Sequence, residues 1–393
     1  MNINKDMNIK ALTLLCVLAI INNMTAMSII MGAGRLAFDM GAGALSTIPV
    51  GINYFAIMFG AIPVSYLFIR FGIRFGLIIV NIFSALASSG IILSIEYQSF
   101  ALLLISLFFM GVSLSAMHQI RYIATDTVND KYKPIAMSLI LSMPIFGGLI
   151  FPSIVDFMQN TYGTNHYLSG YTMLYVTQFL LIATAIVMLC VFRLNINYKP
   201  KSKKIDLSIL KKKGLKPAIL ITALGYSVMT FLMTATPLYM QSIGYSLGES
   251  NTLIGYHVVG MSLPSLIIAY IIVKFGISST VKIGMAVYSG VFVFNVFGGD
   301  SYISLMMGLI LLGVGWSATY SGGSNYITKV LTTDERMRAQ GIADTFVFMG
   351  TGIAGFLSGL TMYYIGWLGT NLILVISIII IAIANYRLKS IVK

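Results

Sequence analysis

Few side chains in this sequence could carry chemistry, and those that could stand inside long apolar runs. Arg121 follows His118 and Gln119 near the end of one run, and Asp344 lies about two turns into another. A charged side chain at the centre of a bilayer costs about 2.5–3.5 kcal/mol, so such a residue is a functional candidate. Histidine titrates near neutral pH. We therefore predict proton coupling, with His118, His257 and Asp344 as its candidate residues.

Each of these residues also has a purely structural interpretation. Arg121 either faces a central cavity and holds an anionic or carbonyl-rich group of a solute, or it reaches from its helix toward the inner surface. The histidines either couple a proton or are interior side chains with satisfied hydrogen bonds, and we expect the second role. For Asp344 we expect an inner gate rather than proton binding, and its candidate partners there are Lys329, Arg336 and Arg338.

The elements that position these residues follow from the composition. Of 393 residues, 58 % are hydrophobic and 9 % are charged, whereas soluble domains carry about 25 % charged residues. A membrane span needs about 20 apolar residues and must be helical, because lipid satisfies no backbone hydrogen bond. The fold class predicted is all-α integral membrane, with twelve spans at 9–31, 45–68, 75–94, 100–124, 135–157, 172–192, 217–239, 252–273, 279–297, 303–326, 338–362 and 367–386.

The cations predict the orientation. If the amino terminus is cytoplasmic, all of the 25 Lys and Arg residues except Arg35 and Arg121 fall in cytoplasmic segments. This bias places both termini in the cytoplasm of a multi-pass protein of the plasma (inner) membrane. The predicted domains are an N-terminal six-helix bundle (1–192), a basic cytoplasmic linker (193–216) and a C-terminal six-helix bundle (217–393). The net charge of +13 reflects these loops, so we expect no nucleic-acid partner.

Pairs of similar three-residue segments indicate an internal duplication. Phe71-Gly72-Ile73 after the second span returns as Phe275-Gly276-Ile277 after the eighth, and Met110-Gly111-Val112 returns as Leu312-Gly313-Val314. The offsets, 204 and 202 positions, agree with a plan of two halves. Duplicated halves around a site at the middle of the membrane are typical of secondary transporters that work by alternating access.

The segment 65–74 resembles the signature of the major facilitator superfamily between spans two and three. Leu67, Arg70, Gly72 and Arg74 match it, whereas Ser65 and Ile69 replace its glycine and aspartate. The resemblance implies a charge network at a cytoplasmic gate, and the missing aspartate leads us to the hypothesis that Asp126 pairs with Arg70 or Arg74. The predicted gate network comprises Arg70, Gly72, Arg74, Asp126, Asp334, Glu335, Arg336 and Asp344.

The second half is similar to a bacterial branch of that superfamily, in which riboflavin-type vitamin uptake is suggested for some members. The resemblance rests on segments 225–229, 234–237, 256–258, 313–316, 322–323, 334–336 and 339–340. An antiporter signature in span five matches only in part, at Pro144, Gly147 and Gly148. We therefore interpret Pro144 and Pro152 as kinks, which membrane helices tolerate.

By the same resemblance, spans one, four, seven and ten line the cavity. Tyr226, Thr230 and Thr234 recur every fourth residue and share one helical stripe. Such a lining suits a neutral, aromatic or hydroxyl-bearing solute, and the alternative is ordinary hydrogen bonding between helices. The candidate cavity residues are Asn22, Asn23, His118, Gln119, Arg121, Tyr226, Thr230, Thr234, His257, Tyr320, Asn325 and Tyr326.

These observations predict a secondary active transporter, proton-coupled, of a small organic solute. The alternatives are an uncoupled facilitator, a multidrug or metabolite exporter, or a membrane sensor that transports nothing. The sequence holds no phosphate-binding loop for ATP, no nucleophile elbow and no zinc motif. We accordingly expect no enzyme activity, no cofactor and no metal, and a monomer in the lipid bilayer.

Overall fold

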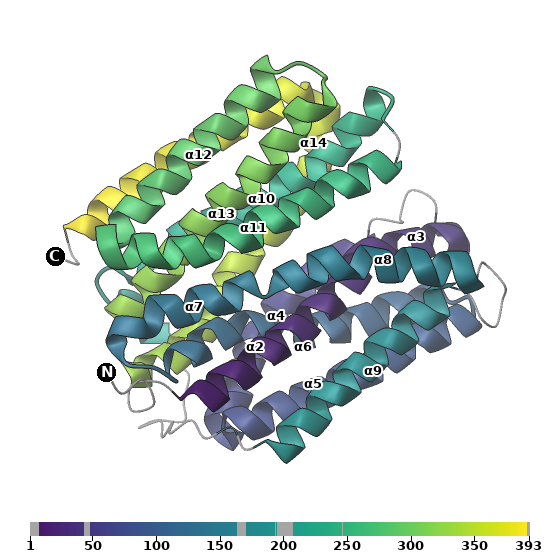
Figure 1. The fold of residues 1–393 in the computed structure, drawn as a ribbon, viewed down its shortest axis with the longest axis horizontal. Coiled ribbons are helices and arrows are strands. Elements are labelled where there is room, and N and C mark those ends of the chain that lie inside the picture. The colour runs from purple at the N-terminus through teal and green to yellow at the C-terminus, as the bar shows by residue number, and fades with distance from the viewer. Residues whose placement is uncertain are drawn as a thin grey trace. The chain divides into compact units, whose positions relative to one another are not determined.

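The computed structural model describes residues 8–42, 48–162, 170–192, 194, 207–245 and 247–390, and its regular elements are helices (Figure 1). Eleven of the described stretches are long and apolar enough to cross a bilayer. The last of them, Gly341–Lys389, contains two predicted spans and is broken at Gly366, where φ is 65° and ψ is −171°. The predicted all-helical fold with twelve spans is therefore confirmed.

The elements of the first half follow the predicted spans closely. They are α2 (Ile9–Ser28), the π-helical η1 (Ile29–Ala33), α3 (Gly34–Ala37), the π-helical η2 (Phe38–Ala42), α4 (Ile48–Phe71), α5 (Ile73–Glu96), α6 (Phe100–Thr125), the 3₁₀ turn η4 (Asp130–Tyr132), α7 (Lys133–Ser142), α8 (Pro144–Tyr162) and α9 (Gly170–Val191).

The second half repeats this layout. Its elements are the 3₁₀ turn η5 (Leu207–Lys211), α10 (Leu215–Ser242), α11 (Leu247–Phe275), α12 (Ile277–Phe297), α13 (Tyr302–Val330) and α14 (Thr333–Lys389). Most of the predicted linker, 193–216, lies outside the described residues.

The first span differs from its prediction at its C-terminal end. We expected the helix to stop near residue 31, but helical turns continue through two π-helical segments as far as Gly41, where φ is 85° and ψ is 14° and the helical path is broken. Gly32 lies close to α9: a Cβ atom there would come within 2.9 Å of Leu174 Cδ2 and 3.3 Å of the Tyr175 hydroxyl. Farther along, the hydroxyl of Tyr171 donates a 2.5 Å hydrogen bond to Asp39. Packing on α9 thus keeps a glycine-rich segment helical.

The fifth span is divided where a kink was expected. Helix α7 ends at Ser142 and α8 begins at Pro144, since proline removes one backbone donor and clashes with the preceding turn. The other expected kink, at Pro152, lies within α8, whose helical assignment continues to Tyr162.

The chain forms two compact units, each described here by itself. Unit 1 contains residues 1–128, 146–205 and 340–345, and unit 2 contains 129–145, 206–339 and 346–393. In unit 1, α6 packs against α4 and α5, and α5 also packs against α9. In unit 2, α13 packs against α10, α11 and α12, and α7 packs against α11. A short piece of α14 therefore belongs to unit 1.

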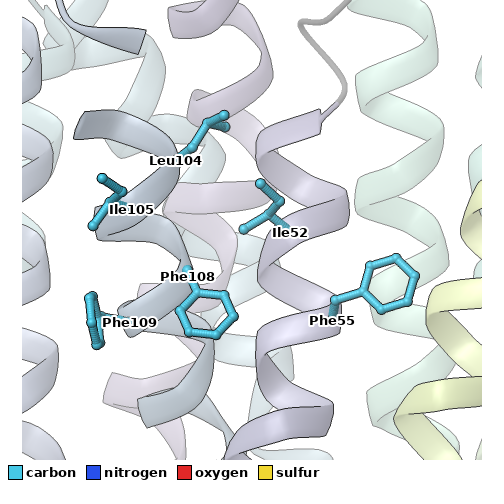
Figure 2. A pocket seen from close by; sticks show the side chains of 6 residues that line it. All are labelled: Ile52, Phe55, Leu104, Ile105, Phe108 and Phe109. Carbon is cyan, nitrogen blue, oxygen red and sulfur yellow. The ribbon is translucent and has the colours of Figure 1, made fainter. Parts of the chain in front are cut away.

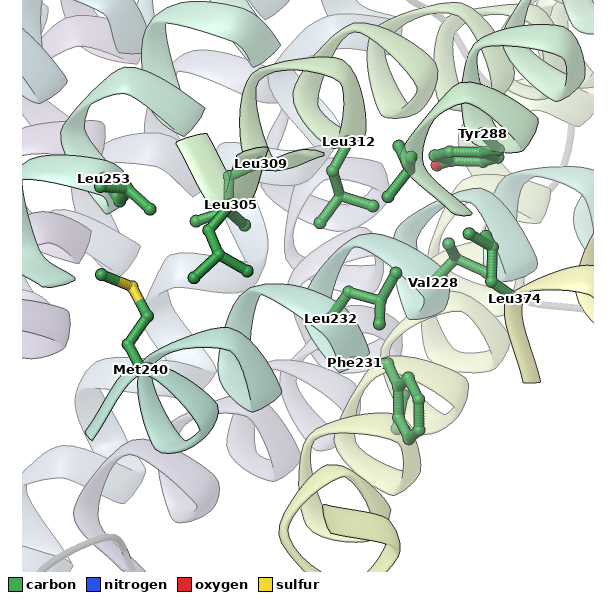
Figure 3. Close-up of a cluster of buried hydrophobic side chains, with 12 residues drawn as sticks. Val228, Phe231, Leu232, Met240, Leu253, Tyr288, Leu305, Leu309, Leu312 and Leu374 are labelled. Carbon is green, nitrogen blue, oxygen red and sulfur yellow. The ribbon is translucent and has the colours of Figure 1, made fainter. Parts of the chain in front are cut away.

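A cluster of buried apolar side chains forms a core of unit 2. Figure 3 shows that these side chains come from several helices. The cluster comprises Val228, Phe231, Leu232, Met240, Leu253, Tyr288, Val291, Leu305, Leu309, Leu312, Ala354 and Leu374.

The echo between the two halves has a structural basis. Gly72 precedes α5 and Gly276 precedes α12, with φ/ψ values of 81°/161° and 82°/163°. Residues with a side chain rarely adopt this backbone conformation, whereas glycine adopts it freely. The same tight turn therefore joins the second span to the third and the eighth to the ninth.

Candidate functional site

A buried ion pair forms the centre of a candidate site in unit 1. Nη2 of Arg121, near the end of α6, lies 2.6 Å from Oδ1 of Asp344, and the two side chains are 1 % and 0 % exposed. Oδ2 of Asp344 has no hydrogen-bond partner within the described part of the chain. Two charges removed from solvent in this way depend on each other, because removing either leaves an uncompensated buried charge.

Neighbouring groups of α6 fix the position of the Arg121 guanidinium. Its Nη1 donates a 2.7 Å hydrogen bond to the carbonyl oxygen of His118, and its Nη2 donates a 3.0 Å bond to the Tyr122 hydroxyl. The guanidinium carbon also lies 4.4 Å from the centre of the Tyr122 ring, a favourable cation–π distance. The cation is thus held in place by its own helix, and the pair with Asp344 connects that helix to α14.

Helix α4 supports the same site through small and polar residues. Gln119 donates to the carbonyl of Ala61 at 2.8 Å and accepts a 2.8 Å bond from Ser65. A Cβ atom on Gly341 would lie 2.5 Å from the Ser65 hydroxyl and 2.7 Å from the Ala61 oxygen, so only glycine permits this approach of α14. These contacts explain why residues 340–345 belong to unit 1. They also make Gln119, a predicted cavity residue, part of the α4–α6 contact.

The partner expected for Asp344 was wrong. We predicted Lys329, Arg336 or Arg338, all near it in sequence, and the structure pairs Asp344 with Arg121, 223 residues away. The side chain of Arg338 lies outside the described residues. Arg121 correspondingly neither points freely into a cavity nor reaches outward, since it is 1 % exposed and bound to a carboxylate.

The predicted pairing of Asp126 with Arg70 or Arg74 is not formed in the part of the chain that the structure describes. Arg70 donates to the Tyr66 hydroxyl at 3.0 Å. Arg74 donates to the carbonyl oxygens of Leu189 and Cys190, at 2.8 and 2.7 Å, and so holds the end of α9. Asp126 follows α6 as its C-terminal cap.

The other predicted gate residues gather where α14 begins. Thr332 and Glu335 form a capping box: the Glu335 carboxylate accepts from the Thr332 backbone N–H at 2.8 Å, and its own N–H donates to the Thr332 hydroxyl. Lys212 also pairs with this carboxylate. Burial alone would raise the pKa of Glu335, but the bonds from Lys212 and Thr332 hold it below its usual value. Arg336 is buried, and the Asp334 side chain lies outside the described residues.

Predicted cavity residues of the seventh and tenth spans form an aromatic cluster in unit 2. Tyr226 of α10 meets Tyr320 of α13 edge to face, with ring centres 5.2 Å apart. Trp316 stacks on Tyr320 at 4.9 Å, and Phe348 of α14 lies 5.4 Å from Tyr226. One turn along α10, Thr230 is buried and its hydroxyl has no partner among the described residues.

His257 is buried, and one of its two ring nitrogens makes a packing contact. Its Nδ1 lies 2.8 Å from the carbonyl oxygen of Leu309, so the ring joins α11 to α13. Asn53, 204 positions earlier, donates a 3.1 Å bond to the Leu107 carbonyl and joins α4 to α6 in the same way. The two sites are equivalent in the repeat, which indicates a packing function. Nε2 of His257 has no partner within the described ranges.

The remaining cavity candidates divide between packing contacts and exposed positions. Asn325 donates to the Ser321 carbonyl at 2.9 Å, and Tyr326 donates to Asn385 at 3.2 Å. The Asn325 bond lies within α13, whereas the Tyr326 bond joins α13 to α14. Asn22 and Asn23 are buried on α2, Thr234 is exposed and His118 is half-buried.

A groove on unit 1 is unlike the predicted polar cavity. It has a volume of about 420 Å³ and lies between α4 and α6 (Figure 2). The six side chains that line it are all apolar: Ile52, Phe55, Leu104, Ile105, Phe108 and Phe109. On a membrane-spanning helix pair, such a lining suits acyl chains and offers no group for a polar solute.

Sequence reasoning missed several residues of these sites. Trp316 and Phe348 complete the aromatic cluster, and Ser65 and Tyr122 support the ion pair. A tryptophan within a polar span was the one available signal, because an indole N–H needs a partner when it is buried. Phe348 and Tyr122 resemble ordinary core residues in sequence.

Comparisons with known proteins agree with this architecture. The sequence model of the Major Facilitator Superfamily matches residues 13–299 and 218–390. The uncharacterized MFS-type transporter YddS of Bacillus subtilis is 28 % identical over 343 residues, covering 83 % of this chain and 79 % of that protein. The riboflavin transporter RfnT of Brucella anthropi is 26 % identical, covering 82 % and 81 %.

Among solved structures, the fucose:proton symporter FucP of E. coli aligns with a TM-score of 0.76 over 96 % of this chain and 98 % of its own. At 14 % identity this likeness concerns the fold. The family model, in contrast, covers nearly the whole sequence. This chain therefore belongs to the Major Facilitator Superfamily and is a membrane transporter, not an enzyme.

Proposed function

We propose that this protein is a proton-coupled secondary active transporter that moves a small organic solute across the plasma membrane by alternating access. The observation that carries the proposal is the buried pair between Arg121 and Asp344. Ionisable residues inside membrane spans are costly and are kept where they serve ion or solute movement. The pair joins the fourth predicted span to residues 340–345 of the eleventh, so a change at Asp344 alters how this segment is held on α6.

The coupling follows from the charges. A proton that binds Asp344 at Oδ2 neutralises the carboxylate and leaves the Arg121 cation without its counter-charge. A buried ion pair that loses one charge is strongly destabilised, so protonation favours a conformation in which α6 and α14 separate. The group bonded to this carboxylate is Arg121, and the Tyr122 hydroxyl and the His118 carbonyl hold the guanidinium from its other side. Release of the proton on the opposite side restores the pair and resets the cycle.

The orientation and the solute class rest on other observations. The cations of the predicted loops favour cytoplasmic termini. The relatives named above include a transporter of riboflavin, and the solved structures include a symporter of fucose and protons. Both are small organic solutes, and protons accompany one of them. A monomer in the bilayer suffices for this mechanism.

The experiment is solute uptake into proteoliposomes with an imposed pH gradient, comparing the native protein with Asp344→Asn. Asn keeps the size of the side chain but binds no proton, so we expect accumulation against a gradient to stop while exchange of labelled for unlabelled solute continues. Asp130→Asn is the matched control, since it makes the same change in an exposed pair with Lys133. Undiminished accumulation by Asp344→Asn, or accumulation that survives collapse of the pH gradient, would leave an uncoupled facilitator as the function.

A further inference from the structure

The aromatic cluster of unit 2 has a composition that apolar packing does not explain. It consists of Tyr226, Trp316, Tyr320 and Phe348, contributed by α10, α13 and α14. The rings of Trp316 and Tyr320 are nearly parallel, at 17°. Tyr226 is in edge-to-face contact with each of the other three, with ring centres 5.2 to 5.7 Å away. Three tyrosine and tryptophan side chains bring polar atoms into a region that phenylalanine and leucine would fill without them.

Two of the polar atoms in this region are buried without a partner in the described part of the chain. They are Nε1 of Trp316, a residue 4 % exposed, and the hydroxyl of Thr230, a residue 1 % exposed. An unsatisfied buried donor costs about 1–3 kcal/mol, and folded proteins keep few of them. Thr230 stands on the same face of α10 as Tyr226, one turn away, and its methyl group lies 3.7 Å from a Cβ position on Gly355 of α14.

We propose that this aromatic cluster is the recognition site for the ring system of a planar, uncharged heteroaromatic solute. The inference rests on the proposed function, because it names the solute class of that transporter. The solute stacks on the Trp316–Tyr320 pair, and an acceptor on its edge receives the indole N–H while Thr230 bonds a second edge atom. In the structure the four rings pack on one another. Because Tyr226 contacts the other three, it is the side chain that must change rotamer to admit the solute.

Counting polar groups distinguishes this class from a sugar. Both kinds of molecule stack on tryptophan, but each hydroxyl of a sugar brings a donor and an acceptor that need partners once buried. The polar groups in and beside the cluster are few: the indole N–H of Trp316, the hydroxyls of Tyr226 and Tyr320, and the hydroxyl of Thr230 one turn along α10. A fused ring with a broad apolar face and two or three edge atoms matches that inventory, whereas a polyol does not. The cluster itself contains no charged side chain, so an organic ion finds no counter-charge in it.

The test uses riboflavin as the probe, because flavin emission is quenched on contact with tryptophan and tyrosine rings. We expect saturable quenching with the purified transporter, at least a tenfold rise in Kd for Trp316→Leu and a smaller rise for Trp316→Phe, which keeps a ring but loses the N–H. Trp367→Leu is the matched control, since Trp367 is the other of the chain's two tryptophans and stacks on Tyr239. Thermal unfolding shows which variants are folded, and Thr230→Val tests the second contact in a folded background.

Two outcomes overturn the inference. In the first, Trp316→Leu and Thr230→Val leave the Kd for riboflavin unchanged. In the second, the native protein accumulates L-fucose but shows no saturable binding of riboflavin. In the second case the proposed function stands, because accumulation of fucose under a pH gradient still shows coupled transport. If riboflavin binding depends on Trp316 but uptake ignores the pH gradient, coupling fails and the recognition site stands.

Discussion

The two halves of the chain share a scaffold and differ in the chemistry placed on it. Asn53 and His257 make equivalent bonds to the carbonyls of Leu107 and Leu309. Yet 202 positions beyond Arg121, the second half has Gly323. A Cβ atom there would lie 2.7 Å from the backbone N of Thr222, so α10 and α13 approach too closely for a side chain. Duplication thus preserved helix contacts, but Arg121 has no charged counterpart at the equivalent position of the second half, and that half holds the aromatic cluster.

The largest effect should come from removing the charge that distinguishes the first half. Arg121→Leu leaves Asp344 buried without its partner, and we expect a loss of about 3–5 kcal/mol in the free energy of unfolding. The double variant Arg121→Leu/Asp344→Leu should recover most of that loss, yet accumulate no solute. Thermal unfolding in detergent measures the first effect and proteoliposome uptake the second. Equal stability of the single and double variants would contradict a coupled pair.

The shared scaffold is tested at the glycines that the repeat preserves. Gly111→Ala would bring a Cβ to 2.7 Å from the Cβ of Ala56, and Gly313→Ala to 2.6 Å from the carbonyl oxygen of His257. Overpacking of this kind costs about 1–3 kcal/mol, and we expect similar losses at the two sites. Gly255→Ala is the control, because no atom lies within 4 Å of its Cβ position. If only one of the variants Gly111→Ala and Gly313→Ala had a lower unfolding midpoint, the two glycines would not be structurally equivalent.

Exchanging the equivalent polar residues sharpens the assignment of His257. His257→Asn can keep the bond to the Leu309 carbonyl, whereas His257→Leu loses it, and a typical net hydrogen bond is worth about 0.5–1.5 kcal/mol. We expect the leucine variant alone to be destabilised, and proton-driven uptake to persist in the asparagine variant. Loss of that uptake in a stable His257→Asn protein would return His257 to proton coupling.

The smallest effect concerns Glu335, at the start of α14. Its pKa in the folded protein lies below its ordinary value of 4.5. Its bonds to Lys212 and Thr332 therefore stabilise the fold above pH 4.5, and this contribution disappears as the pH falls through the lowered value. Because both side chains of the pair are partly exposed, Glu335→Gln should cost at most about 1 kcal/mol. Unfolding curves at a series of pH values from 7 downward check the prediction, since the difference should shrink as the pH falls through the lowered pKa.

The sequence predicted span limits well where charges or turns frame an apolar run. The fourth span was expected at 100–124 and α6 covers Phe100–Thr125. The first span was expected to end at 31, because closely spaced glycines such as Gly32 and Gly34 are typical of a loop. Contacts with α9 keep that segment helical instead, and hydropathy contains no information about such neighbours.

The candidate sites were predictable only as separate residues. Arg121 and Asp344 were both identified by the cost of burying charge, but their pairing depends on α6 and α14 being adjacent in space. The stripe of Tyr226 and Thr230 followed from helical spacing. Trp316 was noted only within the segment 313–316 that resembles the bacterial branch, and not as a cavity residue, because an aromatic side chain on a membrane-spanning helix is ordinarily core. Spacing along one helix is visible in a sequence, whereas neighbours across helices are not.

The matching turns at Gly72 and Gly276 have a consequence for how such a protein acquires new cargo. Each turn sets the path by which one helix leaves the membrane surface and the next returns, and backbone conformation alone determines that path. Substitutions on the inward faces of the helices then leave the framework intact. Such a chain can change its solute specificity by single substitutions of lining residues, while the turns that connect its helices stay the same.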